Sequence, residues 1–131
     1  MKYRIIIAGS RSFNDFDLLK KVLDDYLKNA AGTAKEFEII GGGAMGADTL
    51  GEKYAHIKGI PFRLFLPDWK RYGKAAGLIR NNEMAKYAAM EIGVLFAFWD
   101  GESKGTKNMI LSGKATSLEI HIIEYGDKNS I

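Results

Sequence analysis

Apolar and polar positions along the chain follow two periodicities. Short runs of β-branched and aromatic residues, most of them closed by glycine or proline, are typical of buried strands, and they lie at residues 3–8, 37–40, 61–66, 94–99 and 119–123. Between them, apolar residues recur at helical spacing and predict helices over residues 15–28, 45–58, 76–89 and 104–116. Asn14 or Asp15 is expected to cap the first helix, residues 68–73 to form a loop, and residues 126–131 a loose tail.

Strands that alternate with helices predict one α/β domain over residues 1–125. Its sheet is expected to be parallel, five-stranded and covered by helices on both faces, which is a Rossmann-like, doubly wound fold. Right-handed crossovers favour the strand order 3-2-1-4-5. The first and fourth strands then lie side by side at the topological switch point, where such folds bind ligands.

Composition narrows the function classes. The chain has 131 residues, 47% of them hydrophobic and 27% charged, which is an ordinary mix for one globular domain. No run of about 18 apolar residues predicts a membrane span, and the first strand begins too early for a signal peptide. Cysteine is absent, which excludes disulfides and thiolate metal sites and is consistent with a cytoplasmic protein. The net charge of +3, with acidic residues interleaved throughout, does not favour nucleic-acid binding.

Three turns that follow strands carry the candidate chemistry. They span residues 9–12, 41–48 and 100–106, are rich in glycine or hydroxyl groups, and each leads into a predicted helix. Glycine permits close backbone approach, and the N–H groups of a helix start attract anions. One such turn often does no more than end a strand, but three at one sheet edge predict a phosphate site. The candidate ligand-binding residues of these turns are Gly9, Ser10, Arg11, Gly42, Gly43, Ala44, Gly46, Ala47, Asp48, Ser103, Gly105 and Thr106.

Side chains near the same edge extend the candidate site. The guanidinium forks of Arg11 and Arg80 suit phosphate, and Asn81 is expected beside them, whereas the nearby lysines serve equally well as a solvated rim. Trp69 and Tyr72 are placed to stack on a base.

Two further candidates keep a structural alternative. Trp99 ends a buried strand and fits the core as well as a stacking role. Asp48 would either cap its helix or bind a ribose hydroxyl. No histidine is placed as a general base, and no metal site is expected.

Of two known phosphate-binding fingerprints, these turns lack one and match the other. The Lys-Ser or Lys-Thr pair of a P-loop is missing. Residues 41–46 match G-x-G-x-x-G, and Asp68 follows Gly46 by 22 residues, which is the spacing of a ribose-binding acid in dinucleotide enzymes. The chain is short for a complete dehydrogenase, so an NAD-dependent oxidoreductase is not favoured.

Four segments together resemble a known family. They are residues 6–13, residues 42–48, the pairs Asp68-Trp69 and Arg80-Asn81, and residues 97–106. These segments, in this order along the chain, resemble the motifs of the SLOG superfamily. The resemblance covers residues 2–123 and is greatest to its small single-domain branch of bacterial and phage proteins, the YspA-like group (DUF2493). Met45 stands where an arginine is frequent in that branch, so the ligand contact of such an arginine does not carry over.

The resemblance implies a Rossmann-like domain that senses or processes nucleotide-derived ligands, such as ADP-ribose-like molecules. Phosphoribohydrolases of the superfamily carry P-G-G-x-G-T-x-x-E, and residues 103–106 occupy the comparable loop without that motif. Relatives similar to DprA share a glycine turn followed by an acid, as in residues 46–48, and act on single-stranded DNA. A third group binds signalling nucleotides without necessarily turning them over.

The sequence therefore favours a domain that senses or sequesters a small nucleotide-like ligand, with no cofactor, no metal and no catalytic residue assigned. The first alternative is a hydrolase of an N-glycosidic or phosphate bond, for which Asp48, Asp68, Asp100 and Glu102 are the available carboxylates. Single-stranded DNA binding is the second alternative. A homo-oligomer is left open.

Overall fold

The computed structural model describes residues 2–30 and 36–126 and contains one parallel sheet. Its strands are β1 (Lys2–Gly9), β2 (Glu36–Gly41), β3 (Phe62–Leu64), β4 (Ile92–Trp99) and β5 (Glu119–Glu124). They lie in the order β3-β2-β1-β4-β5, all parallel, which confirms the predicted strand order and fold class. In the central pairs, Ile6 of β1 lies beside Ile40 of β2 and Leu95 of β4.

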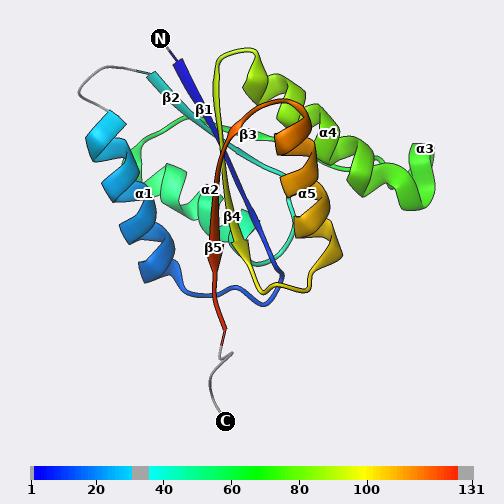
Figure 1. Cartoon of the computed structure of the whole chain (residues 1–131), viewed down its shortest axis with the longest axis horizontal. Helices are drawn as coiled ribbons and strands as arrows, with labels where there is room; N and C mark the ends of the chain where they lie inside the picture. Colours follow the sequence, from blue (N-terminus) through cyan, green and yellow to red (C-terminus); the bar gives the residue numbers. More distant parts are fainter. Residues whose placement is uncertain (1, 31–35, 127–131) are drawn as a thin grey trace.

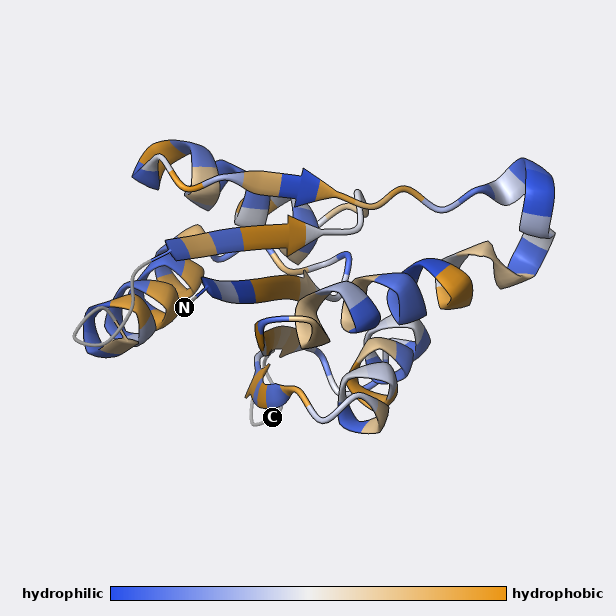
Figure 2. Ribbon diagram, turned by 90° about the horizontal axis from the view of Figure 1, so that it is seen from above, coloured by the Kyte–Doolittle hydropathy of each residue, from blue (hydrophilic) through white to orange (hydrophobic). Residues whose placement is uncertain are grey.

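Helices cover both faces of this sheet (Figure 1). Helices α1 (Phe16–Ala30) and α2 (Ala47–Lys58) pack on one face, where Ile5 and Ile7 belong to the core. Helices α4 (Ala76–Ala89) and α5 (Lys104–Ala115) pack on the other face, over Ile6 and Ala8. This alternation along β1 explains its unbroken apolar run, because a strand buried on both faces has no polar side. In Figure 2 the strands combine orange, hydrophobic stretches with blue, hydrophilic residues, and the helices are mixed as well.

The turns after β1, β2 and β4 open at the same edge of the sheet because the strands are parallel. Asp15 caps α1, since its Oδ1 accepts the Leu18 N–H at 3.0 Å, as one of the two expected caps. Gly59 closes α2 with a left-handed φ of 69°. Among the described residues, no helix is long and apolar enough to cross a membrane.

The main departure from the predicted elements lies between β3 and α4. The third strand ends at Leu64 rather than at residue 66, and residues 69–75 form the short helix α3 (Trp69–Tyr72) and the 3₁₀ turn η1 (Gly73–Ala75) where a loop was predicted. The cause is a local cap that periodicity cannot reveal, since Asp68 Oδ1 accepts the Arg71 N–H at 3.2 Å. We call residues 68–75 the arm.

The arm buries none of its helical residues and stands away from the sheet beyond the start of α4 (Figures 1 and 2). Smaller differences are that α2 begins at Ala47 rather than at residue 45, and β4 at Ile92 rather than at residue 94. Most of the predicted tail, residues 127–131, lies outside the described residues.

Candidate functional site

A cleft of about 970 Å³ opens at the carboxyl edge of the sheet, between the three turns, the arm and the first turns of α4 and α5. Its volume is at the upper end of the range for small-molecule sites, about 300–1,000 Å³. The cleft brings together these residues predicted from the sequence: Gly9, Ser10, Arg11, Gly42, Gly43, Ala44, Asp48, Trp69, Arg80, Asn81, Ser103, Gly105 and Thr106.

Five predicted residues do not line the cleft: Gly46, Ala47, Asp68, Tyr72 and Trp99. Trp99 donates its indole N–H to the Ser103 carbonyl at 3.0 Å. This bond fits the structural role offered for Trp99 as the alternative to stacking on a base. The carboxylate of Asp68, which had the spacing of a ribose-binding acid, caps α3 instead. Tyr72 lies on the arm, where its ring is 5.2 Å from the Arg71 guanidinium.

The first turn is tied to the end of β4. The Ser10 N–H donates to the Phe98 carbonyl at 3.0 Å, and Ser10 Oγ accepts the Asp100 N–H at 3.1 Å. A Cβ at Gly9 would overlap the Phe98 carbonyl oxygen and lie 2.7 Å from Ala47 Cβ. Gly9 and Ser10 thus fix how the chain packs at this edge, and the free groups of the turn come from the next two residues.

Asp48 fixes the turn after β2, residues 41–48, which we call the glycine turn. Its side chain is buried, Oδ2 accepts the Gly42 N–H at 3.0 Å, and the Ala44 N–H also bonds to it. Burial raises the pKa of Asp48 to about 6, against the opposing effects of these N–H groups and of the Arg80 charge. Arg80 holds the other side of the turn, since Nη1 donates to the Gly42 carbonyl. The Asp48 carboxylate therefore shapes the turn from within the protein.

Arg80 and Asn81 also join α4 to α5. Arg80 Nε donates to Asn81 Oδ1 at 3.0 Å, and Asn81 Nδ2 donates to Asn108 Oδ1 at 2.9 Å. Both polar atoms of the buried Asn81 amide are therefore bonded within the protein. Burial lowers the pKa of Arg80. Among the described residues Nη2 of Arg80 has no acceptor, so it is available to an anion in the cleft.

The start of α5 is capped twice. Asp100 Oδ1 accepts the Glu102 and Ser103 N–H groups, both at 2.8 Å, and these bonds hold the pKa of Asp100 below its usual value. Ser103 Oγ accepts the Thr106 N–H at 3.4 Å. The caps leave the N–H groups of the first two helical residues unoccupied. At Gly105 an added Cβ would meet nothing within 4 Å, so this position opens to the cleft.

Each of the three turns therefore presents at least two backbone N–H groups without an acceptor among the described residues. They include those of Arg11 and Ser12, Gly43 and Met45, and Lys104 and Gly105. All but Lys104 line the cleft. Such unpaired N–H groups, with the partial positive charge of helix starts, bind anions. Arg11 and Lys74 add charge at the same cleft, and neither forms an ion pair within the described part of the chain.

Sequence reasoning missed the apolar part of the cleft. Met84 and Met109 lie at its bottom, where α4 and α5 pack together, and Leu66 and Leu78 lie exposed at its rim. The sequence analysis assigned neither methionine to the site. Leu66 was placed in a buried strand, but it follows the end of β3 and is 66% exposed.

Comparison with known proteins identifies the family. The model of the YspA, cpYpsA-related SLOG family (YAcAr) matches residues 3–72, which include the first two turns. The chain belongs to this family. Another similar sequence is the Gene 61 protein of Mycobacterium phage D29, which is 32% identical over 130 residues, or 95% of this chain and 98% of that protein.

The SLOG-type fold also occurs in a larger solved structure. The X-ray structure of DNA processing protein A (DprA) from Streptococcus pneumoniae superposes with a TM-score of 0.72 and 17% identity over 98% of this chain. The chain spans about half of that protein, 52% of its length. At this identity the similarity shows that the two share a fold.

Proposed function

We propose that this SLOG-family domain binds a phosphate-bearing, nucleotide-derived ligand in the cleft and holds it, as a sensor or sequestering protein. The observation that carries the proposal is the set of unpaired N–H groups from three turns at one sheet edge. Backbone N–H groups suit phosphate oxygens, and their positions are fixed by the bonds of Ser10, Asp48 and Ser103. Arg11, Lys74 and the free Arg80 Nη2 would neutralise the phosphate charge.

Binding is favoured over hydrolysis by the state of the carboxylates. Asp68 and Asp100 accept backbone N–H groups and cap local structure. Asp48, whose pKa is raised, lies buried below the glycine turn and bonds to its N–H groups. A hydrolase of an N-glycosidic or phosphate bond would require an acid and a base facing the reacting bond. The carboxylates nearest the cleft have structural partners instead.

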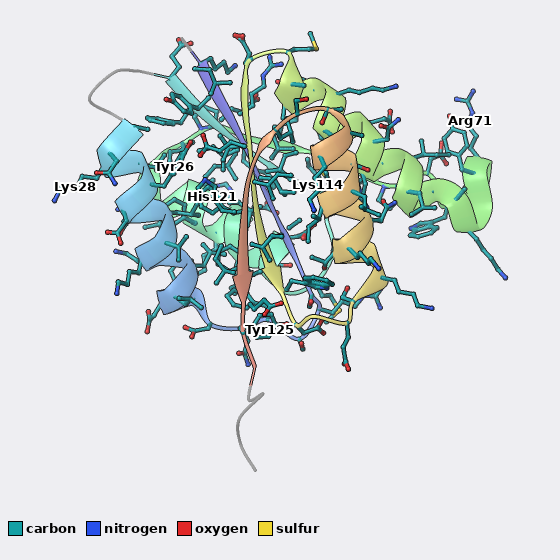
Figure 3. The ribbon with its side chains drawn as sticks, viewed as in Figure 1. Tyr26, Lys28, Arg71, Lys114, His121 and Tyr125 are labelled. Atoms are coloured by element: carbon teal, nitrogen blue, oxygen red, sulfur yellow. The ribbon has the colours of Figure 1, made fainter. Side chains whose placement is uncertain are left out.

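Calorimetric titration with 5′-mononucleotides and ADP-ribose tests the proposal. Arg11→Ala should weaken binding about 10- to 100-fold, because a charge-assisted hydrogen bond contributes roughly 1.5–3 kcal/mol. Lys114→Ala is the control, since it removes the same charge from the end of α5 (Figure 3) and should leave affinity unchanged. A ligand recovered unaltered after long incubation would support holding over turnover.

Single-stranded oligonucleotides provide the opposing outcome. If DNA were the partner, affinity would grow with strand length and fall steeply with salt, because many phosphates would share the contact. Length-dependent oligonucleotide binding without mononucleotide or ADP-ribose binding would overturn the proposal.

A further inference from the structure

Contacts between lining segments place the cleft residues in order. A Cβ at Gly46 would lie 2.9 Å from Arg11 Cα, so the first turn lies against the glycine turn. A Cβ at Gly43 would lie 2.7 Å from Leu66 Cδ2, so the glycine turn lies against the segment that leads to the arm. The cleft therefore runs from Arg11, past the glycine turn and Leu66, to Trp69 on the arm.

The chemistry of the lining changes along this path. The end near Arg11 carries the unpaired N–H groups of Arg11 and Ser12, and those of Gly43 and Met45 follow in the glycine turn. At the arm end, Leu66, Leu78 and Trp69 are 66%, 52% and 59% exposed, although each is apolar and lines the cleft. Apolar side chains gathered at the rim of a cleft indicate a site whose occupant removes them from water.

Trp69 is positioned as a flat platform at the arm end. Its ring lies against the first turn of α4, with Cη2 3.7 Å from the position of a Cβ at Gly77. This contact supports the ring from one side, and its 59% exposure leaves the rest open to the cleft and solvent. Aromatic rings in this setting stack on heterocyclic bases, and such a stack is tolerant of base identity because every base has a π-face.

We propose that the nucleobase of the ligand stacks on Trp69, with Leu66 and Leu78 around it, while the phosphate occupies the N–H groups near Arg11. The occupant is then a nucleotide, with base and phosphate at opposite ends of the cleft, rather than a sugar phosphate or inorganic phosphate. The inference rests on the proposed function, since it places the base relative to the phosphate site argued above.

The test compares Trp69→Ala with Tyr72→Ala on the intact chain. Both residues are exposed aromatics of the same short helix, but Tyr72 does not line the cleft. Calorimetric probes are the four common ribonucleoside 5′-monophosphates, ADP-ribose and ribose 5-phosphate. Trp69→Ala should weaken nucleotide binding about 5- to 100-fold, Trp69→Phe should recover most of it, and Tyr72→Ala should have no effect.

Ribose 5-phosphate separates the two ends of the cleft. It should bind more weakly than the nucleotides, and its affinity should not change in Trp69→Ala, because it has no base to stack. A second readout uses Trp99→Phe, which leaves Trp69 as the sole tryptophan, and there bound nucleotide should quench the fluorescence.

The outcomes separate the inference from the proposed function. If nucleotides bind wild type and Trp69→Ala equally while Arg11→Ala loses them, the base does not lie on Trp69 and the phosphate site stands. The same holds if ribose 5-phosphate binds as tightly as every nucleotide. If neither the nucleotides nor ADP-ribose bind at all, both proposals fail.

Discussion

Replacement of Gly46 by alanine tests whether the first two turns form one rigid unit. Gly46 precedes α2 with φ 83° and ψ −127°, a conformation that side chains rarely adopt. A Cβ there would also overlap the Ser10 carbonyl oxygen and lie 2.9 Å from Arg11 Cα. Both obstacles are backbone atoms, and they cannot move aside as the end of a flexible side chain would.

The expected loss can be built from two parts. The strained backbone costs about 1–3 kcal/mol and the forced separation of the turns about 1–3 kcal/mol. Alanine also reduces the conformational entropy of the unfolded chain, which offsets this loss by about 0.4–1 kcal/mol. Gly46→Ala should therefore lower the free energy of unfolding by about 1–5.6 kcal/mol, with a middle value of about 3 kcal/mol. Gly59→Ala is the matched control, because Gly59 has a φ of 69° but an added Cβ would meet nothing within 4 Å. Gly59→Ala should lower the free energy of unfolding by about 1 kcal/mol, because only the left-handed backbone conformation opposes the alanine side chain.

Urea unfolding followed by circular dichroism measures both variants, with the midpoint falling at constant slope. The same samples titrated with nucleotide should show weaker binding for Gly46→Ala and unchanged binding for Gly59→Ala, which lies at the far end of α2. Equal stability losses in the two variants would refute the argument, because the contact with Ser10 and Arg11 would then contribute nothing.

Two further predictions concern acidic residues that accept hydrogen bonds within the fold. The folded pKa of Asp48 is about 6, above its unfolded value, so its stabilising contribution is present below about pH 4 and is lost as pH rises through 6. The free energy of unfolding of the wild type, measured relative to Asp48→Asn, should therefore fall by up to about 3 kcal/mol between pH 4 and 7. A difference between the two proteins that stays constant in urea melts over this pH range would contradict the prediction. Asp24 accepts hydrogen bonds from the fully buried Tyr54 hydroxyl at 2.6 Å and from Lys20 at 2.8 Å. Asp24→Ala should cost about 1–3 kcal/mol in thermal melts because Tyr54 loses its partner, while the exposed neighbour Asp25→Ala should change stability by less than about 0.5 kcal/mol.

The fold was predictable from the sequence because its signals are local. Each buried strand is a compact apolar run, each helix has its own periodicity, and the handedness of crossovers then leaves few strand orders. The helix in the arm was not predicted from the sequence, because α3 spans only residues 69–72, too few for a periodic pattern, and depends on the Asp68 cap. The end of β3 at Leu64 was not predicted, because the apolar run from Phe62 to Leu66 is typical of a buried strand. In the structure Leu64 and Leu66 are exposed at the edge of the sheet.

The place of the candidate site was predictable, but the roles of its residues were not. Parallel topology alone puts the three turns at one edge. The bonds that decide which atoms are free join distant segments, such as Arg80 to Gly42 and Ser10 to Asp100, and no sequence pattern encodes such pairs. The spacing that marked Asp68 as a ribose ligand arises here from a helix cap.

The side chain of Met45 takes no part in shaping the glycine turn. The turn is shaped by Asp48 from below and by Arg80 from the side, and both bonds go to the backbone of Gly42. The groups that the turn offers to an anion are backbone N–H groups of Gly43 and Met45, and the Met45 side chain is 70% exposed. Any residue with an N–H can supply such a group. If the cleft binds phosphate as proposed, the turn supplies backbone N–H groups whatever side chain stands at position 45, and the positive charge comes from Arg11, Lys74 and Arg80.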